Sequence, residues 1–404
     1  MTAPAPTTSN GVAARPDLTI ALPNTTGDTV TCHLNRPASR IDWGSTPPRS
    51  REIYAAAHVV VDPLRNDPQG ARSAIDWDST LSFRRHLWSL GFGVADAMDT
   101  AQRGGGLSWL DARELITRSA AEAAHLSGQL VCGAMTDQLD ATSTYDLNSI
   151  VDAYLEQATH IHQSGATPVL MASRQLCHAA TSAEDYLTVY TQVLNQLNTP
   201  VMLHWLGDAF DPALTGYWGS HDLDTAADTV LQIMTDHPNK IVGIKMSVLD
   251  AAREVDFRRR LPAGIAIFTG DDFNYAELIA GDDHGHSNAL LGIFDAIAAP
   301  ARTAFDRLDA GDTAGFHDIL APTVPLSRHL FTAPTSAYKT GVVFLAWLNG
   351  HQSHFHMVAG AQSHRSVAHL TRAFQLANSA GALTDPDLAA HRMRQWLALA
   401  GFDA

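Results

Sequence analysis

Short apolar runs alternate with amphipathic stretches from about residue 52 onward. Eight runs have the length of strands, and several combine Val, Ile, Leu and Gly with few polar members, as is typical of strands buried on both faces of a parallel sheet. They are residues 57–61, 93–97, 130–133, 168–172, 201–204, 241–245, 265–268 and 287–291. This part of the chain is therefore expected to form an α/β domain.

The segments between these runs show the periodicity of amphipathic helices. Clear examples are residues 78–90, 110–126, 147–164, 183–197 and 225–235, several of which open on Asp or Ser at a capping position. Eight strand and helix units in strict alternation predict a (β/α)8 barrel, and a doubly wound open sheet is the competing arrangement.

The two ends of the chain follow other patterns. Residues 1–17 are rich in Ala, Pro, Thr and Ser and predict a flexible tail, while apolar residues alternate in 18–22 and 30–34 and predict a β-hairpin. After about residue 300 only helical periods occur. We predict a tail, hairpin and connector in 1–51, a barrel in 52–305 and a C-terminal helical domain in 306–404. The helical periods of that domain are 301–308, 313–330, 335–348, 366–380 and 387–399.

Composition narrows the possible partners. The formal net charge is −15 and charged residues make up 17% of the chain, which argues against nucleic acid or an anionic membrane surface as a partner. Three widely spaced cysteines fit reduced thiols. No apolar run is long enough to span a bilayer, and the N-terminus has no hydrophobic signal core. We expect a cytoplasmic protein that binds a small molecule.

Lys245 is the most informative residue of the chain, because it ends the apolar run 241–244. A lysine removed from water has a lowered pKa, and its neutral amine can attack a carbonyl carbon. The sequence alone allows two interpretations, a Schiff-base lysine or a lysine at the rim whose ammonium reaches solvent.

Other polar residues also follow the predicted strands. Active sites of (β/α)8 barrels lie at the carboxyl ends of the strands, so these residues are expected to converge if the fold is correct. The set comprises Asp62, Asp96, Asp99, Thr100, Thr136, Asp137, Ser173, Arg174, His204, Lys245, Ser247, Thr269, Asp271, Asp272 and residues 284–288.

Residues 243–245 (Gly-Ile-Lys), followed by residues 269–272 (Thr-Gly-Asp-Asp), resemble two strand signatures of the dihydrodipicolinate synthase and N-acetylneuraminate lyase family of class I aldolases. Residues 199–203, 165–166 and 325–331, with Pro334 and Lys339, resemble further segments of that family in the same order. The resemblance extends over about 52–350 and suggests a divergent branch. It implies that Lys245 forms an imine with a carbonyl substrate, for aldol cleavage, condensation or dehydration. It further implies that no cofactor is needed, and that the chain forms a homodimer or homotetramer.

The resemblance also implies a substrate site around this lysine. Carried over to this sequence, with polar residues of the strand ends added, the predicted substrate-binding residues are Asp99, Thr100, Ser173, Arg174, Ser247, Gly270, Asp271, Asp272 and Ser287.

Two departures from the family pattern change the expected chemistry. The family has a proton-relay tyrosine after its fourth strand, where this chain reads Met-Ala-Ser-Arg at 171–174, so we predict that His204 transfers the proton instead. In the second strand loop Asp99 stands where the family binds the substrate carboxylate, and like charges repel in a dry site. We therefore expect poor turnover of pyruvate and better turnover of a hydroxylated ketone or a sugar-derived 2-oxo acid.

Two alternatives to a Schiff-base lyase stay open from the sequence. A metal-dependent lyase or hydrolase could use Asp62, Asp96, His204 and His286 as ligands, because a His-x-His pair occurs at 284–286. The other alternative is a non-catalytic barrel that only binds a ligand, since a fold does not determine a function.

Overall fold

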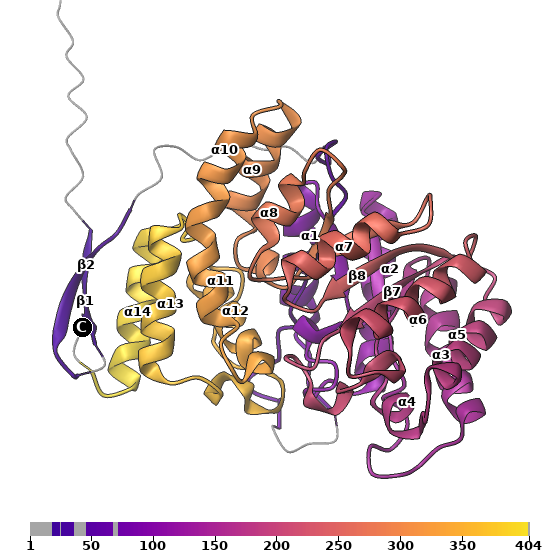
Figure 1. Ribbon diagram of the computed structural model, residues 1–404. Helices are drawn as coiled ribbons and strands as arrows, with labels where there is room; N and C mark the ends of the chain where they lie inside the picture. The colour runs from indigo at the N-terminus through magenta and orange to yellow at the C-terminus, as the bar shows by residue number, and fades with distance from the viewer. Residues whose placement is uncertain (1–17, 25, 36–45, 68–71, 403–404) are drawn as a thin grey trace, which may run out of the picture.

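The computed structural model describes residues 18–24, 26–35, 46–67 and 72–402. The predicted tail 1–17 and most of the connector lie outside these residues. Eight parallel strands close into a barrel in the order β10-β3-β4-β5-β6-β7-β8-β9, which confirms the (β/α)8 prediction over the open sheet (Figure 1). The strands are β3 (Ile53–Ala56), β4 (Gly93–Asp96), β5 (Leu130–Ala134), β6 (Thr167–Leu170), β7 (Val201–Leu206), β8 (Ile241–Ser247), β9 (Ala266–Thr269) and β10 (Asn288–Leu291).

The first barrel strand lies earlier than its predicted range. The run from Ile53 to Val61 is apolar except for His58, and all nine of these residues are buried, so composition could not distinguish its two halves. Hydrogen bonding decides the register, because β3 pairs with β10 on one side and β4 on the other. The predicted range 57–61 becomes a buried loop that ends in a bridge between Val61 and Ile75.

Helices surround the barrel as the periodicity predicted. Several begin at an Asp or Ser whose side chain accepts a hydrogen bond from the backbone two or three residues on, as Asp76 does from the N–H of Ser79 at 3.1 Å. The helices of this layer are α1 (Trp77–Ser89), α2 (Trp109–Leu126), α3 (Leu147–Gln163), α4 (Arg174–Ala179), α5 (Ala183–Gln196), α6 (Leu223–Asp236), α7 (Ala251–Arg260) and α8 (Tyr275–Ala280).

Alternating strand residues fill the inside of the barrel. Tyr54, Val131, Met202, Phe268 and Leu290 belong to one buried cluster, separate from the larger cluster between strands and helices. This packing closes the barrel into a solid core rather than a pore. Side chains at the carboxyl ends of the strands lie above that core.

The C-terminal helices form the predicted helical region. The predicted helix 313–330 is interrupted between α10 and α11, where Pro322 and Pro325 cannot donate backbone hydrogen bonds. The helices are α9 (Ala298–Asp309), α10 (Thr313–Leu320), α11 (Val324–Leu330), α12 (Tyr338–Leu348), α13 (Val367–Ser379) and α14 (Pro386–Leu399). In the described part of the chain, none of the helices is both long and apolar enough to cross a membrane.

The N-terminal hairpin packs against the end of the chain. β1 (Thr19–Pro23) and β2 (Thr29–His33) pair antiparallel, as predicted. Arg394 of α14 donates to the carbonyl of Thr19 at 2.6 Å, and Asn378 of α13 donates to the carbonyl of His33 at 2.9 Å. Figure 1 shows the hairpin beside α13 and α14, on the side away from the barrel. The hairpin therefore precedes the barrel in sequence but packs against the C-terminal helices in space.

Candidate active site

Lys245 lies inside the barrel near the carboxyl end of β8. Side chains of a strand alternate in direction, and Val242 faces outward with 41% of its surface exposed, so Lys245 and Ser247 face inward. Lys245 is 7% exposed and stands in register with His204 of β7 and Phe268 of β9. Among the described residues, its amine has no hydrogen-bond or ion-pair partner. Burial lowers the pKa of Lys245, an effect opposed by the negative charges of Asp99 and Asp272.

Gly270 makes room for this lysine. Its backbone N–H donates to the carbonyl of Met246 at 2.7 Å, which brings the turn after β9 over the end of β8. A Cβ at position 270 would stand 2.7 Å from Cε of Lys245 and still closer to Oγ of Ser247. The sequence placed Gly270 among the substrate-binding residues, and the structure adds that only glycine fits beside the lysine stem without a shift.

The two carboxyl groups that raise the pKa of Lys245, Asp272 and Asp99, lie in different environments. Asp272 is 4% exposed, and its Oδ1 accepts the N–H of Ile293 at 3.0 Å. Burial raises the pKa of Asp272 to about 7, although the Ile293 hydrogen bond and the charge of Lys245 oppose the shift. Asp99, in the short 3₁₀ helix Asp99–Ala101, is only partly buried and faces a cavity. Carboxyl groups in such unlike settings can divide proton transfer and substrate binding between them.

His204 lies beside Lys245 in a less polar environment than its predicted role requires. It is fully buried, its Nε2 stands 3.2 Å from Oγ of Ser247, and its Nδ1 has no partner among the described residues. Burial and the positive charge of Lys245 hold the pKa of His204 well below its usual range. The imidazole is therefore neutral near pH 7 and is poorly suited to accept a proton.

Two predicted substrate-binding residues, Thr100 and Ser173, form hydrogen bonds with other buried hydroxyl groups. Oγ1 of Thr100 lies 2.8 Å from the phenol oxygen of Tyr338, a residue of α12 that the sequence-based site omitted. Oγ of Ser173 lies 2.6 Å from Oγ1 of Thr136 and also accepts the N–H of Leu176 at the start of α4. Tyr338 lies one residue before Lys339, which belongs to the segment that resembles the family. That segment was the part of the sequence from which Tyr338 could have been predicted as a site residue.

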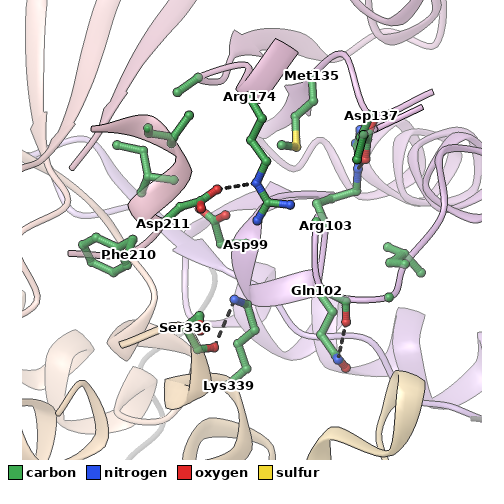
Figure 2. A pocket seen from close by; sticks show the side chains of 18 of the residues that line it. Asp99, Gln102, Arg103, Met135, Asp137, Arg174, Phe210, Asp211, Ser336 and Lys339 are labelled. Carbon is green, nitrogen blue, oxygen red and sulfur yellow. Dashed lines mark hydrogen bonds and ion pairs between the residues drawn. The ribbon is translucent and has the colours of Figure 1, made fainter. Parts of the chain in front are cut away.

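A cavity of about 560 Å³ opens at this end of the barrel. Figure 2 shows Arg174, Asp99 and Asp211 on one side of it and Lys339 on the other. Nε of Arg174 donates to Asp211 at 2.6 Å. Lys245 is not among the lining residues, whereas Asp99 both lines the cavity and acts on Lys245. Asp99 is therefore the lining residue whose charge reaches Lys245.

Two predicted substrate-binding residues are engaged elsewhere. Ser287 precedes β10, at the amino end of that strand, and donates to Glu254 of α7 at 2.7 Å, so its assignment to the site was wrong. The error came from treating the start of a strand as its end. Asp271 accepts hydrogen bonds from the N–H groups of Phe273 and Asn274, which uses its carboxylate within the loop.

The predicted metal ligands are not brought together. Asp96 forms a buried ion pair with Arg84 at 2.7 Å, and Asp62 pairs with Arg65 at 2.5 Å. His286 follows a turn that Asp282 and Gly285 close, rather than lying on a strand. In the part of the chain that the structure describes, no group of three or more His, Cys, Asp or Glu side chains could hold a metal ion.

The fold is that of the dihydrodipicolinate synthases. The enzyme from Thermotoga maritima aligns with a TM-score of 0.60 at 14% identity, over 83% of this chain and 100% of its own. The enzyme from Aquifex aeolicus aligns with a TM-score of 0.58 at 13% identity, over 87% and 98%. The 4-hydroxy-tetrahydrodipicolinate synthase of Methylacidiphilum fumariolicum gives 0.60 at 14%, over 85% and 99%. The predicted resemblance is confirmed in fold, and the low identity fits a divergent branch.

Residues 20–402 match the family described as proteins of unknown function, DUF993, and the chain belongs to that family. The match spans the hairpin, the barrel and the C-terminal helices. No curated protein matches the sequence.

Proposed function

We propose that this protein is a class I lyase or aldolase that forms an imine on Lys245 with a 2-oxo acid or a sugar-derived ketone. The observation that carries the proposal is the buried amine of Lys245, which has no partner among the described residues and a lowered pKa. A neutral amine is the form that attacks a carbonyl carbon. Its position at the carboxyl end of a barrel strand is where such enzymes carry their active sites.

Imine formation requires a proton donor near this amine. The lone pair of Nζ attacks the carbonyl carbon, and a proton passes from the nitrogen to the carbonyl oxygen to give a carbinolamine. Protonation of its hydroxyl group then releases water and leaves the iminium. We assign this proton to Asp272, because a carboxyl group with a pKa of about 7 is partly protonated at neutral pH. The same carboxylate can take a proton back when the imine is hydrolysed.

Asp99 is proposed to face the substrate. It lines the cavity, and its negative charge lies within electrostatic reach of Lys245. An iminium carries a positive charge, so the Asp99 carboxylate stabilises it and can also accept hydrogen bonds from substrate hydroxyls. His204, which the sequence suggested as proton shuttle, is proposed here as a neutral neighbour held by Ser247.

Borohydride reduction tests the proposal. The protein is incubated with a panel of 2-oxo acids and keto-sugars, reduced, and measured by intact and peptide mass spectrometry. We expect a covalent adduct on Lys245 and none in Lys245→Ala. The absence of an adduct across the panel would refute the imine function, and activity that survives Lys245→Ala but not a chelator would favour a metal-dependent lyase.

A further inference from the structure

Lysine is rare in this chain. Of its 27 lysine and arginine residues only three are lysines, at positions 240, 245 and 339. Arginine supplies nearly all positive charge elsewhere. Of the three lysines, Lys245 stands near the carboxyl end of β8, and Lys339 of α12 lines the cavity. An ammonium differs from a guanidinium in being a compact charge with three freely oriented donors. A lysine on a cavity wall is therefore a candidate for ligand binding.

Among the described residues that line the cavity, Lys339 is a cation without a carboxylate partner. Arg103 pairs with Asp137 at 2.5 Å, and Arg174 pairs with Asp211 at 2.6 Å. The half-buried Lys339 donates only to the backbone carbonyl of Ser336, at 3.2 Å, and no carboxylate of the described residues lies within ion-pair distance of it. Figure 2 shows its amine pointing into the space that Arg174 enters from the opposite side. At least one of its N–H donors is left for a ligand.

Lys339 and Lys245 are both influenced by the charge of Asp99. Burial lowers the pKa of Lys339, and the negative charges of Asp99 and Asp211 act in the opposite direction. Asp99 acts in the same way on Lys245. Both amines therefore lie within electrostatic reach of the Asp99 carboxylate, which lines the cavity.

We propose that Lys339 binds a second, anionic group of the substrate, a carboxylate or phosphate remote from the reacting carbonyl. The assignment rests on the imine function proposed above and names its substrate class: carbonyl compounds that carry an acidic group at their far end. A cavity of about 560 Å³ is of the size that holds ligands much larger than a three-carbon oxo acid. The anion would give Lys339 the charged partner that Arg103 and Arg174 already have.

The first test measures Lys339 itself and needs no turnover. The native protein is acetylated with a limiting amount of an amine-reactive ester, and the labelling rate of each lysine is followed by peptide mass spectrometry. Inorganic phosphate or 2-oxoglutarate is expected to slow labelling of Lys339 at least fivefold. Lys240 is the internal control, because its amine donates to the carbonyl of Leu197 at the amino end of β8, away from the cavity. If neither probe at 10 mM changes the labelling of Lys339, the proposal is overturned.

The second test compares matched substrates. The concentrations that give half-maximal borohydride trapping are measured for dihydroxyacetone against its phosphate, and for 2-oxobutyrate against 2-oxoglutarate. In Lys339→Gln the value is expected to rise about tenfold for the member with the extra anion and to stay constant for the other. Lys339→Arg is expected to retain part of the preference, and Lys240→Gln all of it. The two pairs distinguish a phosphate from a carboxylate.

The outcomes separate this proposal from the imine function. If the wild-type protein traps none of the four compounds and no member of the wider panel, the imine function fails, and the labelling result still decides the role of Lys339. If trapping occurs but Lys339→Gln weakens both members of a pair equally, Lys339 supports the fold of the cavity and binds no anion. That result would overturn the inference while leaving Lys245 in place.

Discussion

The raised pKa of Asp272 leads to a quantitative prediction about stability. In the folded protein this carboxyl group keeps its proton up to a pH of about 7, whereas in the unfolded chain it loses the proton near pH 4. The folded state therefore binds more protons between these values, and the stabilising contribution is complete below pH 4 and is lost as the pH rises through 7. For this one group, the free energy of unfolding should fall by about 3 kcal/mol between pH 5 and pH 8.5.

Replacement by asparagine should remove this part of the pH dependence. Asp272→Asn keeps an oxygen for the Ile293 N–H but cannot ionise. Urea unfolding from pH 5 to 8.5 should therefore show a flatter pH profile for the variant than for the wild type. Borohydride trapping at Lys245 should slow by about 100-fold, as is usual when a general acid is lost.

Glu254 offers a matched control. It is also fully buried, burial raises its pKa to about 8, and its partners Ser287 and Thr269 lie away from the cavity. Glu254→Gln should flatten the pH profile of stability in the same direction without slowing trapping. If Asp272→Asn keeps the wild-type pH profile, Asp272 is ionised throughout and the reasoning is refuted. If both variants slow trapping equally, the loss reflects general destabilisation and not proton transfer.

Three further predictions concern the site and the assembly. Gly270→Ala should destabilise the protein by about 1–3 kcal/mol in urea unfolding and reduce trapping, because the added Cβ meets the stem of Lys245; unchanged trapping would show that the lysine has room to move. Wild-type protein should turn over pyruvate poorly, and Asp99→Thr should raise that rate relative to keto-sugars; fast pyruvate chemistry unaffected by the substitution would show that Asp99 does not lie where the carboxylate binds. Light scattering at micromolar concentration should report a homodimer or homotetramer, and a monomer would contradict this expectation.

The sequence alone determined most of the architecture. Period-2 and period-3.6 patterns predicted the hairpin, the eight strand and helix units and the helical C-terminus, because burial on one or two faces dictates where apolar residues must recur. It also singled out Lys245, since a charged residue at the end of an apolar strand needs a reason to be there. Where patterns were continuous, as in 53–61, composition could not place the end of the strand.

Only the tertiary structure decided which polar residues share the site. Closing the barrel placed His204 and Lys245 in register and buried the imidazole fully. The structure also places Ser287 at the amino end of β10, not at its carboxyl end. The C-terminal helices brought Tyr338 and Lys339 to the barrel from some 90 residues beyond Lys245. Local patterns record which face of an element is buried. The pKa of Asp272, and the lack of a carboxylate partner for Lys339 among the described residues, depend on neighbours distant in sequence, which only the folded chain defines.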